Sequence, residues 1–257
     1  MAYLDDFQGK RLSKGFGKDL TIAGAECARG KLIEALPTVL GKRVGYKAVF
    51  TNPESQKRFG VDGPAWGAMF GGMMLRNSTQ VPADFGAKPR YEPDFIVVVK
   101  DAGLADAQTP LEAMAHISEL VPFIELPDIM LDGKPTGAEL IAINAAFRGG
   151  VLGPSIAVTA DEAQALLDAL ASMAVVVGEE RAGAEVGRAR GNVLMGQPIE
   201  AAIWLAKALK RDGIELQPGD LLSLGGFLGS APVKRGTTIS VRYLGLPDNP
   251  VVTVHFD

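Results

Sequence analysis

Apolar residues recur along the chain with two different periods, and these periods predict both helices and strands. Phe95–Val99 is a continuous apolar run of mostly β-branched residues, which is typical of a buried strand. Three threonines, Thr109, Thr136 and Thr159, are each followed three positions later by Glu. This spacing is that of a capping box, in which the two side chains satisfy free backbone N–H groups, so it predicts three helix starts.

The expected elements alternate irregularly. The expected helices cover residues 29–40, 110–120, 140–147, 163–173 and 198–211. The expected strands cover residues 43–50, 95–99, 121–125, 174–177, 220–224, 238–243 and 251–256. Residues 51–74 are expected to be mostly loop. Such irregular alternation with a strand-rich end favours an α+β fold over a repeated βαβ unit. We predict an N-terminal arm over residues 1–28 and a single domain over residues 29–257.

Composition limits the chemistry that is available. The 257 residues include one Cys and two His, so an internal disulfide and a Cys/His zinc site are excluded. With 26 Lys and Arg against 30 Asp and Glu, and no basic cluster, a nucleic-acid partner is not expected. No uncharged apolar run approaches the roughly 18 residues of a membrane span, and the first residues lack the apolar core of a signal peptide. We therefore expect no membrane association and a cytoplasmic location.

Carboxylates provide the first candidate site. Glu92 and Asp94 are two positions apart at the entrance to the apolar run, so on a strand they project to the same face. Glu125 ends the next expected strand. Three such acids suit a hard divalent cation such as Mg²⁺, which prefers oxygen ligands. The alternative is that they are ordinary solvated acids at strand ends.

Lys47 provides the second candidate. It lies in the expected strand 43–50 between apolar neighbours. A lysine that loses its water has a lowered pKa and can exchange protons at neutral pH. The alternative is a lysine whose stem is buried and whose ammonium group reaches solvent. The usual dinucleotide, P-loop, zincin and α/β-hydrolase motifs are absent from the sequence.

The order of these segments resembles the 2-keto-4-pentenoate hydratase family of the fumarylacetoacetate hydrolase superfamily. The resemblance runs from about residue 30 to the end and rests on residues 42–47, 51–62, 92–94, 123–128, 191–201, 218–225 and 233–236. It implies a fumarylacetoacetate hydrolase-like fold, a mixed β-roll with flanking helices. It also implies a homo-oligomer and a small 2-oxo or 2-hydroxy acid as substrate.

The resemblance also implies roles for individual residues. Mg²⁺ or Mn²⁺ would be held by Glu92, Asp94 and Glu125. Lys47 would be the catalytic acid and base, with Asp62 as its partner. The resemblance assigns substrate binding to Gln56, Asn144, Gln197 and Gly226. The implied reaction is the addition of water to a 2-hydroxy-2,4-dienoate, which gives a 4-hydroxy-2-oxo acid.

Several positions depart from the family pattern. The metal pair reads Glu-Pro-Asp instead of Glu-x-Glu, Gln197 stands where the family has His, and Met130 stands where it has Arg. The missing arginine favours a substrate with an apolar tail. Two alternatives therefore stay open. One is a 2-oxo-dioate decarboxylase of the 4-oxalocrotonate type, and the other is a homologue that binds a metal or a small acid without catalysis.

Overall fold

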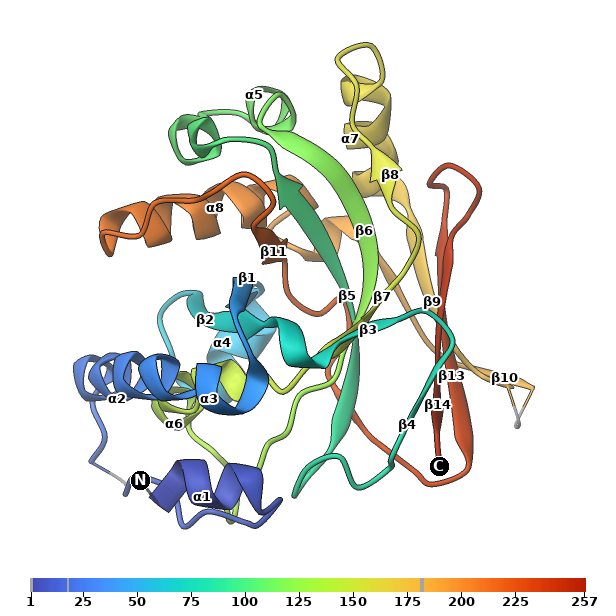
Figure 1. Cartoon of the computed structure of the whole chain (residues 1–257). Coiled ribbons are helices and arrows are strands. Elements are labelled where there is room, and N and C mark those ends of the chain that lie inside the picture. Colours follow the sequence, from blue (N-terminus) through green and yellow to red (C-terminus); the bar gives the residue numbers. More distant parts are fainter. Residues whose placement is uncertain (1, 18, 181–182) are drawn as a thin grey trace.

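Two β-sheets and the helices around them form the molecule in the computed structural model (Figure 1), which describes residues 2–17, 19–180 and 183–257. Within these residues the larger sheet has nine strands and the smaller has five. Both sheets contain parallel and antiparallel pairs. The α+β class predicted from the sequence is confirmed.

The larger sheet has the strand order β2-β1-β11-β5-β6-β7-β3, with β12 paired to β5 and β8 paired to β6. Its strands are β1 (Arg43–Val49), β2 (Ala65–Phe70), β3 (Met74–Arg76), β5 (Arg90–Val99), β6 (Ile117–Glu125), β7 (Gly150–Leu152), β8 (Ile156–Ala157), β11 (Leu221–Ser223) and β12 (Ala231–Pro232). The long antiparallel pair β5–β6 crosses the middle of the molecule in Figure 1. This pair is the frame on which the candidate site is built.

The smaller sheet has the order β10-β9-β13-β14-β4. Its strands are β4 (Thr79–Val81), β9 (Ala174–Glu179), β10 (Ala184–Arg190), β13 (Thr237–Leu244) and β14 (Val251–Phe256). The last two strands, β13 and β14, form an antiparallel pair. Aromatic side chains from this sheet pack on β5, where the Tyr243 ring lies 5.6 Å from that of Phe95. The two sheets therefore share one apolar core.

Helices flank the sheets. The α-helices are α1 (Ala2–Gln8), α2 (Ile22–Ala35), α3 (Pro37–Leu40), α4 (Pro53–Phe59), α5 (Pro110–Met114), α6 (Gly137–Ala142), α7 (Ala163–Ser172) and α8 (Pro198–Arg211). The 3₁₀ turns are η1 (Gly71–Met73), η2 (Ala102–Asp106), η3 (Asn144–Ala146) and η5 (Gly191–Val193). Figure 1 places α1, α2, α3 and α6 together on one side of the first sheet, with α8 and α5 above them. No helix in the described part of the chain is long and apolar enough to cross a membrane.

The first 28 residues, predicted as an arm, contain α1 and the first half of α2, so the predicted boundary falls inside a helix. The N-terminal helix is fastened to the domain through Phe7, which is buried. The Arg148 guanidinium lies 4.0 Å from the Phe7 ring centroid and donates to the Phe7 carbonyl at 2.9 Å. Arg148 also pairs with the buried Asp128 at 3.2 Å.

Four predicted elements need correction, one of them the expected helix 140–147, since α6 ends at Ala142 and residues 144–146 form η3. Helix α2 begins at Ile22 instead of residue 29, because Thr21 caps it by accepting from the Gly24 N–H at 3.1 Å. Residues 51–74 are not mostly loop, since they contain α4, β2 and η1. The expected helix 110–120 ends at Met114, and residues from Ile117 onward belong to β6.

Candidate functional site

Strand β5 presents acidic residues on one face. Glu92 and Asp94 are two positions apart, so their side chains share that face. Glu125 of β6 is the cross-strand neighbour of Glu92 in the antiparallel register, and directly opposed residues also share a face. The strand pairing thus brings together the three acids that the sequence proposed as metal ligands. Asp94 and Glu125 are buried, and Glu92 is half-buried.

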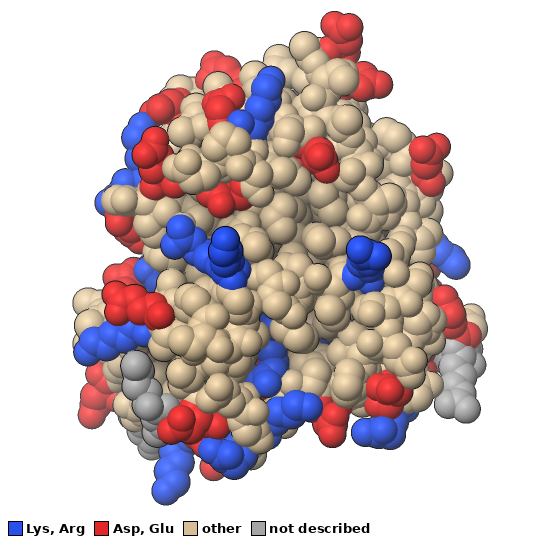
Figure 2. Space-filling view, in the orientation of Figure 1, with Lys and Arg blue, Asp and Glu red and all other residues tan. Residues whose placement is uncertain are grey.

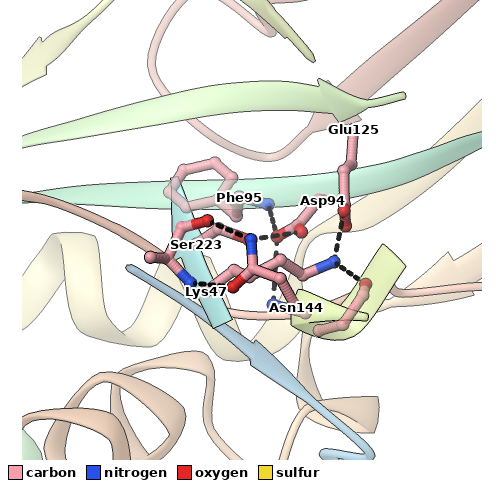
Figure 3. Close-up of polar contacts among 9 residues, drawn as sticks. Lys47, Asp94, Phe95, Glu125, Asn144 and Ser223 are labelled. Carbon is pink, nitrogen blue, oxygen red and sulfur yellow. Dashed lines mark hydrogen bonds and ion pairs between the residues drawn. The ribbon is translucent and has the colours of Figure 1, made fainter. Parts of the chain in front are cut away.

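Asp94 is held by hydrogen bonds from three backbone and side-chain donors. Its carboxylate accepts hydrogen bonds from the Ser223 hydroxyl at 2.6 Å, from the Gly225 N–H at 3.1 Å and from the N–H of the next residue, Phe95 (Figure 3). Ser223 ends β11, the strand between β1 and β5. The structure therefore fixes Asp94 in a single orientation.

Lys47 enters the same space from β1. Its side chain is 4% exposed. The alternative considered above, in which the Lys47 ammonium group reaches solvent, is therefore excluded. The ammonium group forms an ion pair with the Glu125 carboxylate and donates to the Ala145 carbonyl at 3.3 Å (Figure 3). Among the described residues the acidic partner of Lys47 is Glu125, whereas Asp62 is exposed in the turn between α4 and β2. The predicted Lys47–Asp62 pairing is therefore not formed in this structure.

Burial and mutual repulsion govern the protonation of the acids. Burial and the charge of Glu125 raise the pKa of Glu92 to about 8. The same two causes raise the pKa of Asp94 to about 7, although the hydrogen bond from Ser223 acts in the opposite direction. Burial raises the pKa of Glu125, and the charge of Lys47 opposes that increase. Three ionised carboxylates beside one ammonium group would leave two negative charges uncompensated.

A divalent cation would balance those charges. All-oxygen ligands of this kind are the ones that Mg²⁺ and Mn²⁺ prefer. In the described part of the chain, no three acidic, His or Cys side chains already converge on a cation position. The reason is that Asp94 is engaged by hydrogen bonds and Glu125 by Lys47. The donor chemistry and the charge fit a hard cation, which would compete with Lys47 for the Glu125 carboxylate.

Gly226 lies directly against the Glu92 carboxylate. A Cβ atom at Gly226 would stand 1.8 Å from Glu92 Oε1, so a residue with a side chain would displace the acid. This close approach agrees with the prediction that Gly226 belongs to the site. Gly225, which bonds Asp94 with its N–H, adopts φ +102°, a conformation that favours glycine.

The other predicted substrate ligands are occupied by the protein itself. Asn144 is buried, and its amide bonds both backbone groups of Ala68, at 2.7 and 2.8 Å. Gln56 lies on α4 and donates to the Phe50 carbonyl at 2.9 Å. Gln197 caps α8 and donates to the Leu167 carbonyl at 2.9 Å rather than to any residue around Lys47. In this structure Gln197 caps α8, and its role as a substrate ligand stays a prediction.

Two arginines and one serine of the site region were missed from the sequence. Ser223 holds Asp94, as described above, and its signal was its place at the end of an apolar strand. Arg90 occupies the first position of β5, two residues before Glu92, and its guanidinium donates to the Ser230 hydroxyl at 2.8 Å. Arg58 of α4 lies close to Gly229, near enough for its charge to act on Arg90. These cations lie beside the outer end of the row of acids.

On the one face shown in Figure 2, the described basic groups do not gather into one patch. On the face in Figure 2, Lys and Arg side chains are scattered among Asp and Glu. Some of them lie in the hollow in the lower middle of that view. The expectation of no nucleic-acid partner stays a prediction.

Comparisons with known proteins agree on one family. No family model matches the chain. The chain is 27% identical to a 2-keto-4-pentenoate hydratase of Burkholderia vietnamiensis, over 81% of this chain and 75% of the relative. It is 29% identical, with the same shares covered, to the TodF product hydratase of Pseudomonas putida. It is 26% identical to a 4-oxalocrotonate decarboxylase of a Pseudomonas species, over 78% of this chain and 74% of the relative.

Solved structures share the fold. A 4-oxalocrotonate decarboxylase from Pseudomonas putida G7, complexed with magnesium and adipate, superposes with a TM-score of 0.80 at 22% identity, covering 93% of this chain and 87% of that one. A fumarylpyruvate hydrolase from Pseudomonas aeruginosa, in complex with Mn²⁺ and pyruvate, gives a TM-score of 0.57 at 16% identity, with 84% and 89% covered. The fumarylacetoacetate hydrolase-like fold predicted from the sequence is confirmed.

Proposed function

Since the chain belongs to the 2-keto-4-pentenoate hydratase family of the fumarylacetoacetate hydrolase superfamily, we propose that it is a metal-dependent lyase that hydrates a 2-hydroxy-2,4-dienoate. The product would be a 4-hydroxy-2-oxo acid. The observation that supports the proposal most is the buried Lys47–Glu125 pair beside Glu92 and Asp94. It combines a proton carrier and a set of oxygen ligands in one place.

Glu92, Asp94 and Glu125 would hold the divalent cation, Mg²⁺ or Mn²⁺. When bound, the cation would supply a Lewis-acidic charge for the 1-carboxylate and the 2-oxo oxygen of the substrate. Solved relatives in complex with magnesium, calcium or Mn²⁺ support a divalent ion. The choice between Mg²⁺ and Mn²⁺ is part of the proposal.

The proton transfers fall to Lys47 in this proposal. Ketonisation of the dienol moves one proton from the 2-hydroxyl group to carbon 5 of the substrate, and water then adds across the conjugated double bond. Lys47 Nζ is held by Glu125 and the Ala145 carbonyl, so a proton on it is kept at a fixed place. General acid–base catalysis of this kind needs the group within hydrogen-bond reach of the proton it moves. Because Asp62 is exposed, its proposed catalytic role would require a contact that this structure does not contain.

Turnover of the simplest substrate tests the proposal. Purified protein with Mg²⁺ would be mixed with 2-hydroxypenta-2,4-dienoate, and the loss of dienol absorbance would be followed. We expect turnover that stops on chelation of the metal. No turnover with this acid, with longer dienoates or with 2-oxo-dioates would reject both enzymatic proposals and leave the non-catalytic binding homologue.

Glu125→Ala tests the proposed ligands separately. We expect the variant to lose divalent-cation binding, measured by calorimetry, together with turnover. Glu119→Ala is the matched control, because Glu119 lies on the same strand β6 and pairs with Val98, away from the acids. If Glu125→Ala binds the cation as the wild type does, the three-acid site is wrong.

The decarboxylase alternative is favoured by Arg90 and Arg58. Arg90 shares the face of Glu92 on β5. It lies two residues, roughly 7 Å, further along the strand toward its start. A substrate bound by its 2-oxo acid end at Glu92 and Asp94 could place a second carboxylate at Arg90. Arg90 and Arg58 favour a charged substrate tail. This differs from the apolar substrate tail expected from Met130, which stands where the family has Arg. Release of CO₂ from a 2-oxo-dioate, and a loss in Arg90→Gln that affects dioates more than monoacids, would support this alternative.

The remaining expectations from the sequence stay proposals. They are a small 2-oxo or 2-hydroxy acid as substrate, a cytoplasmic location and a homo-oligomer. Light scattering on the eluted protein would measure its mass against the 27.0 kDa of one chain. A monomer would reject the homo-oligomer.

A further inference from the structure

The turn that follows α6 has an unusual backbone. Asn144, Ala145 and Ala146 all have positive φ, at 58°, 54° and 58°. Residues with a Cβ atom adopt this left-handed conformation rarely, and then usually as single residues. Three in succession persist only where the surroundings hold them, and such strain tends to occur at functional sites. The turn is bonded to β2 on one side and to Lys47 on the other.

Asn144 anchors the turn to β2. Its Oδ1 accepts from the Ala68 N–H at 2.7 Å and its Nδ2 donates to the Ala68 carbonyl at 2.8 Å. The neighbouring Gly67 leaves room for the turn, since a Cβ atom there would lie 2.8 Å from the Asn144 carbonyl oxygen. Both side-chain groups of Asn144 are therefore used within the protein, and the residue is 1% exposed. This arrangement argues against a direct contact with substrate.

The turn presents one carbonyl to Lys47. Ala145 lies between the anchored residue and Ala146, whose carbonyl accepts from the Asp128 N–H at 2.9 Å. The Ala145 carbonyl accepts from Lys47 Nζ at 3.3 Å. Lys47 has a flexible four-carbon stem, so the place of its ammonium group depends on its acceptors. These are the Ala145 carbonyl and Glu125.

We propose that Asn144 is a positioning residue, which clamps the left-handed turn 144–146 on β2 so that the Ala145 carbonyl fixes the Lys47 ammonium group. The inference rests on the proposed function for the role of Lys47. Glu125 is also a proposed cation ligand, so a bound cation would compete with Lys47 for its carboxylate. The Ala145 carbonyl is the contact that does not compete with the cation. It would therefore keep Lys47 in place in the active state.

Asn144→Ala tests the proposal against a matched control. Asn77 makes an equivalent clamp on β14, where its amide bonds the Val251 carbonyl at 2.9 Å and the Thr253 N–H at 2.8 Å. It also precedes a residue with positive φ, Ser78 at 61°. Asn77→Ala removes two hydrogen bonds of similar length without touching the turn 144–146. Because Asn77 is exposed and Asn144 is buried, urea unfolding of both variants gives the folded fraction, and kcat is compared per folded molecule.

We expect Asn144→Ala to lower kcat by at least about tenfold and to change KM by less than about threefold. Asn77→Ala should leave both constants close to the wild type. Equal losses of kcat in the two variants would overturn the proposal. So would a rise in KM with unchanged kcat, which would make Asn144 a substrate ligand as the sequence suggested.

A second measurement does not depend on substrate. Lys47 is buried, so its labelling by a water-soluble acetylating reagent, followed by peptide mass spectrometry, should be slow in the wild type. We expect faster labelling in Asn144→Ala and in Gly67→Ala, which pushes the turn away from β2, and no change in Asn77→Ala. Unchanged labelling in both turn variants would reject the positioning role. If the wild type turns over no acid, the proposed function fails while this measurement still decides the inference.

Discussion

The two faces of strand β5 differ in chemistry although their residues alternate along one segment. One face carries Glu92 and Asp94 beside Glu125 and Lys47. The other face carries Phe95, which is 0% exposed and packs on the smaller sheet. We call these the acidic face and the apolar face. Burying the acidic face destabilises the folded state because its charged groups lose their water. Burying the apolar face stabilises the folded state because apolar surface is removed from water.

This difference separates stability from function. The buried acids raise one another's pKa, so the acidic face lowers the stability of the cation-free protein. The apolar face joins the two sheets and supplies the compensating burial. Substitutions on the apolar face should therefore reduce the free energy of unfolding, and those on the acidic face should mainly reduce activity and cation binding.

Lys47→Met should give the largest effect, a loss of kcat of about 10²- to 10⁴-fold, which is the usual contribution of a general acid or base. Met has similar length and cannot carry a proton. Cation binding should be retained because Glu125 loses its competing partner. Stopped-flow kinetics and calorimetry measure the two quantities. Lys100→Met, which changes an exposed lysine just after β5, serves as the control, and equal activity in the two variants would contradict the role of Lys47.

Phe95→Ala tests the apolar face. Truncation of a fully buried Phe leaves a cavity and typically costs about 3–5 kcal/mol of stability. Urea unfolding measures this loss. The kcat per folded molecule should stay near that of the wild type, because the Phe95 side chain points away from the acids. A large loss of kcat without a loss of stability would show that the two faces are not separate.

The fold was predictable where a local signal and the tertiary packing agree. Helix α8 begins at Pro198 as predicted, and the capping box of Thr136 is formed in both directions. The expected helix 110–120 ends at Met114, although its apolar residues continue at helical spacing to Leu120. Pairing with β5 decides the case, since Leu120 lies opposite Val97 in the sheet. Such long-range pairing leaves no local mark in the sequence.

The site was predictable to a similar extent. Glu92 and Asp94 share a face because strand side chains alternate, a property that can be read from spacing. The contact of Lys47 with Glu125 depends on the order of strands in the sheet, so spacing could not show that Lys47 pairs with Glu125 rather than with Asp62 in this structure. Gln197 directly precedes Pro198, a common residue at the first helical position, and that sequence signal already favoured a capping role.

The stability of the cation-free protein should fall as pH rises from about 4 to about 8. The pKa of Glu92 is raised from 4.5 to about 8 and that of Asp94 from 3.8 to about 7. Between those values the folded state binds more protons than the unfolded state, so the free energy of unfolding decreases with pH. One pKa unit corresponds to about 1.4 kcal/mol, so we expect a loss of at least about that size.

Thermal unfolding of the cation-free protein at pH 6 and pH 8 measures the loss of stability between these two pH values. The same measurement with a divalent cation added is the control. Added Mg²⁺ should stabilise the protein more at pH 8, where the acids are ionised, than at pH 6, where protons compete with it. The variant Glu92→Gln should flatten the pH dependence, because it removes the group whose pKa is raised most clearly. A cation effect that is equal at both pH values would contradict the raised pKa values.

Tyr243→Phe should have the smallest effect, and it tests a side chain that reaches from the apolar face to the backbone of Asp94. The Tyr243 hydroxyl lies 2.6 Å from the Asp94 carbonyl and 2.8 Å from the Phe123 carbonyl. It also accepts from the Phe123 N–H at 3.3 Å, so it bridges the backbones of β5 and β6.

Removal of the hydroxyl from Tyr243 should cost about 1 kcal/mol, the usual net value of a buried hydrogen bond, because the ring still fills the core. Urea unfolding of the variant beside Phe95→Ala measures the ratio of the two losses. Because the hydroxyl bonds the backbone of Asp94 and not its carboxylate, cation affinity should be unchanged. A clear loss of cation affinity in Tyr243→Phe would mean that the apolar face positions the acids through the strand, and the separation of the two faces would then hold for side chains only.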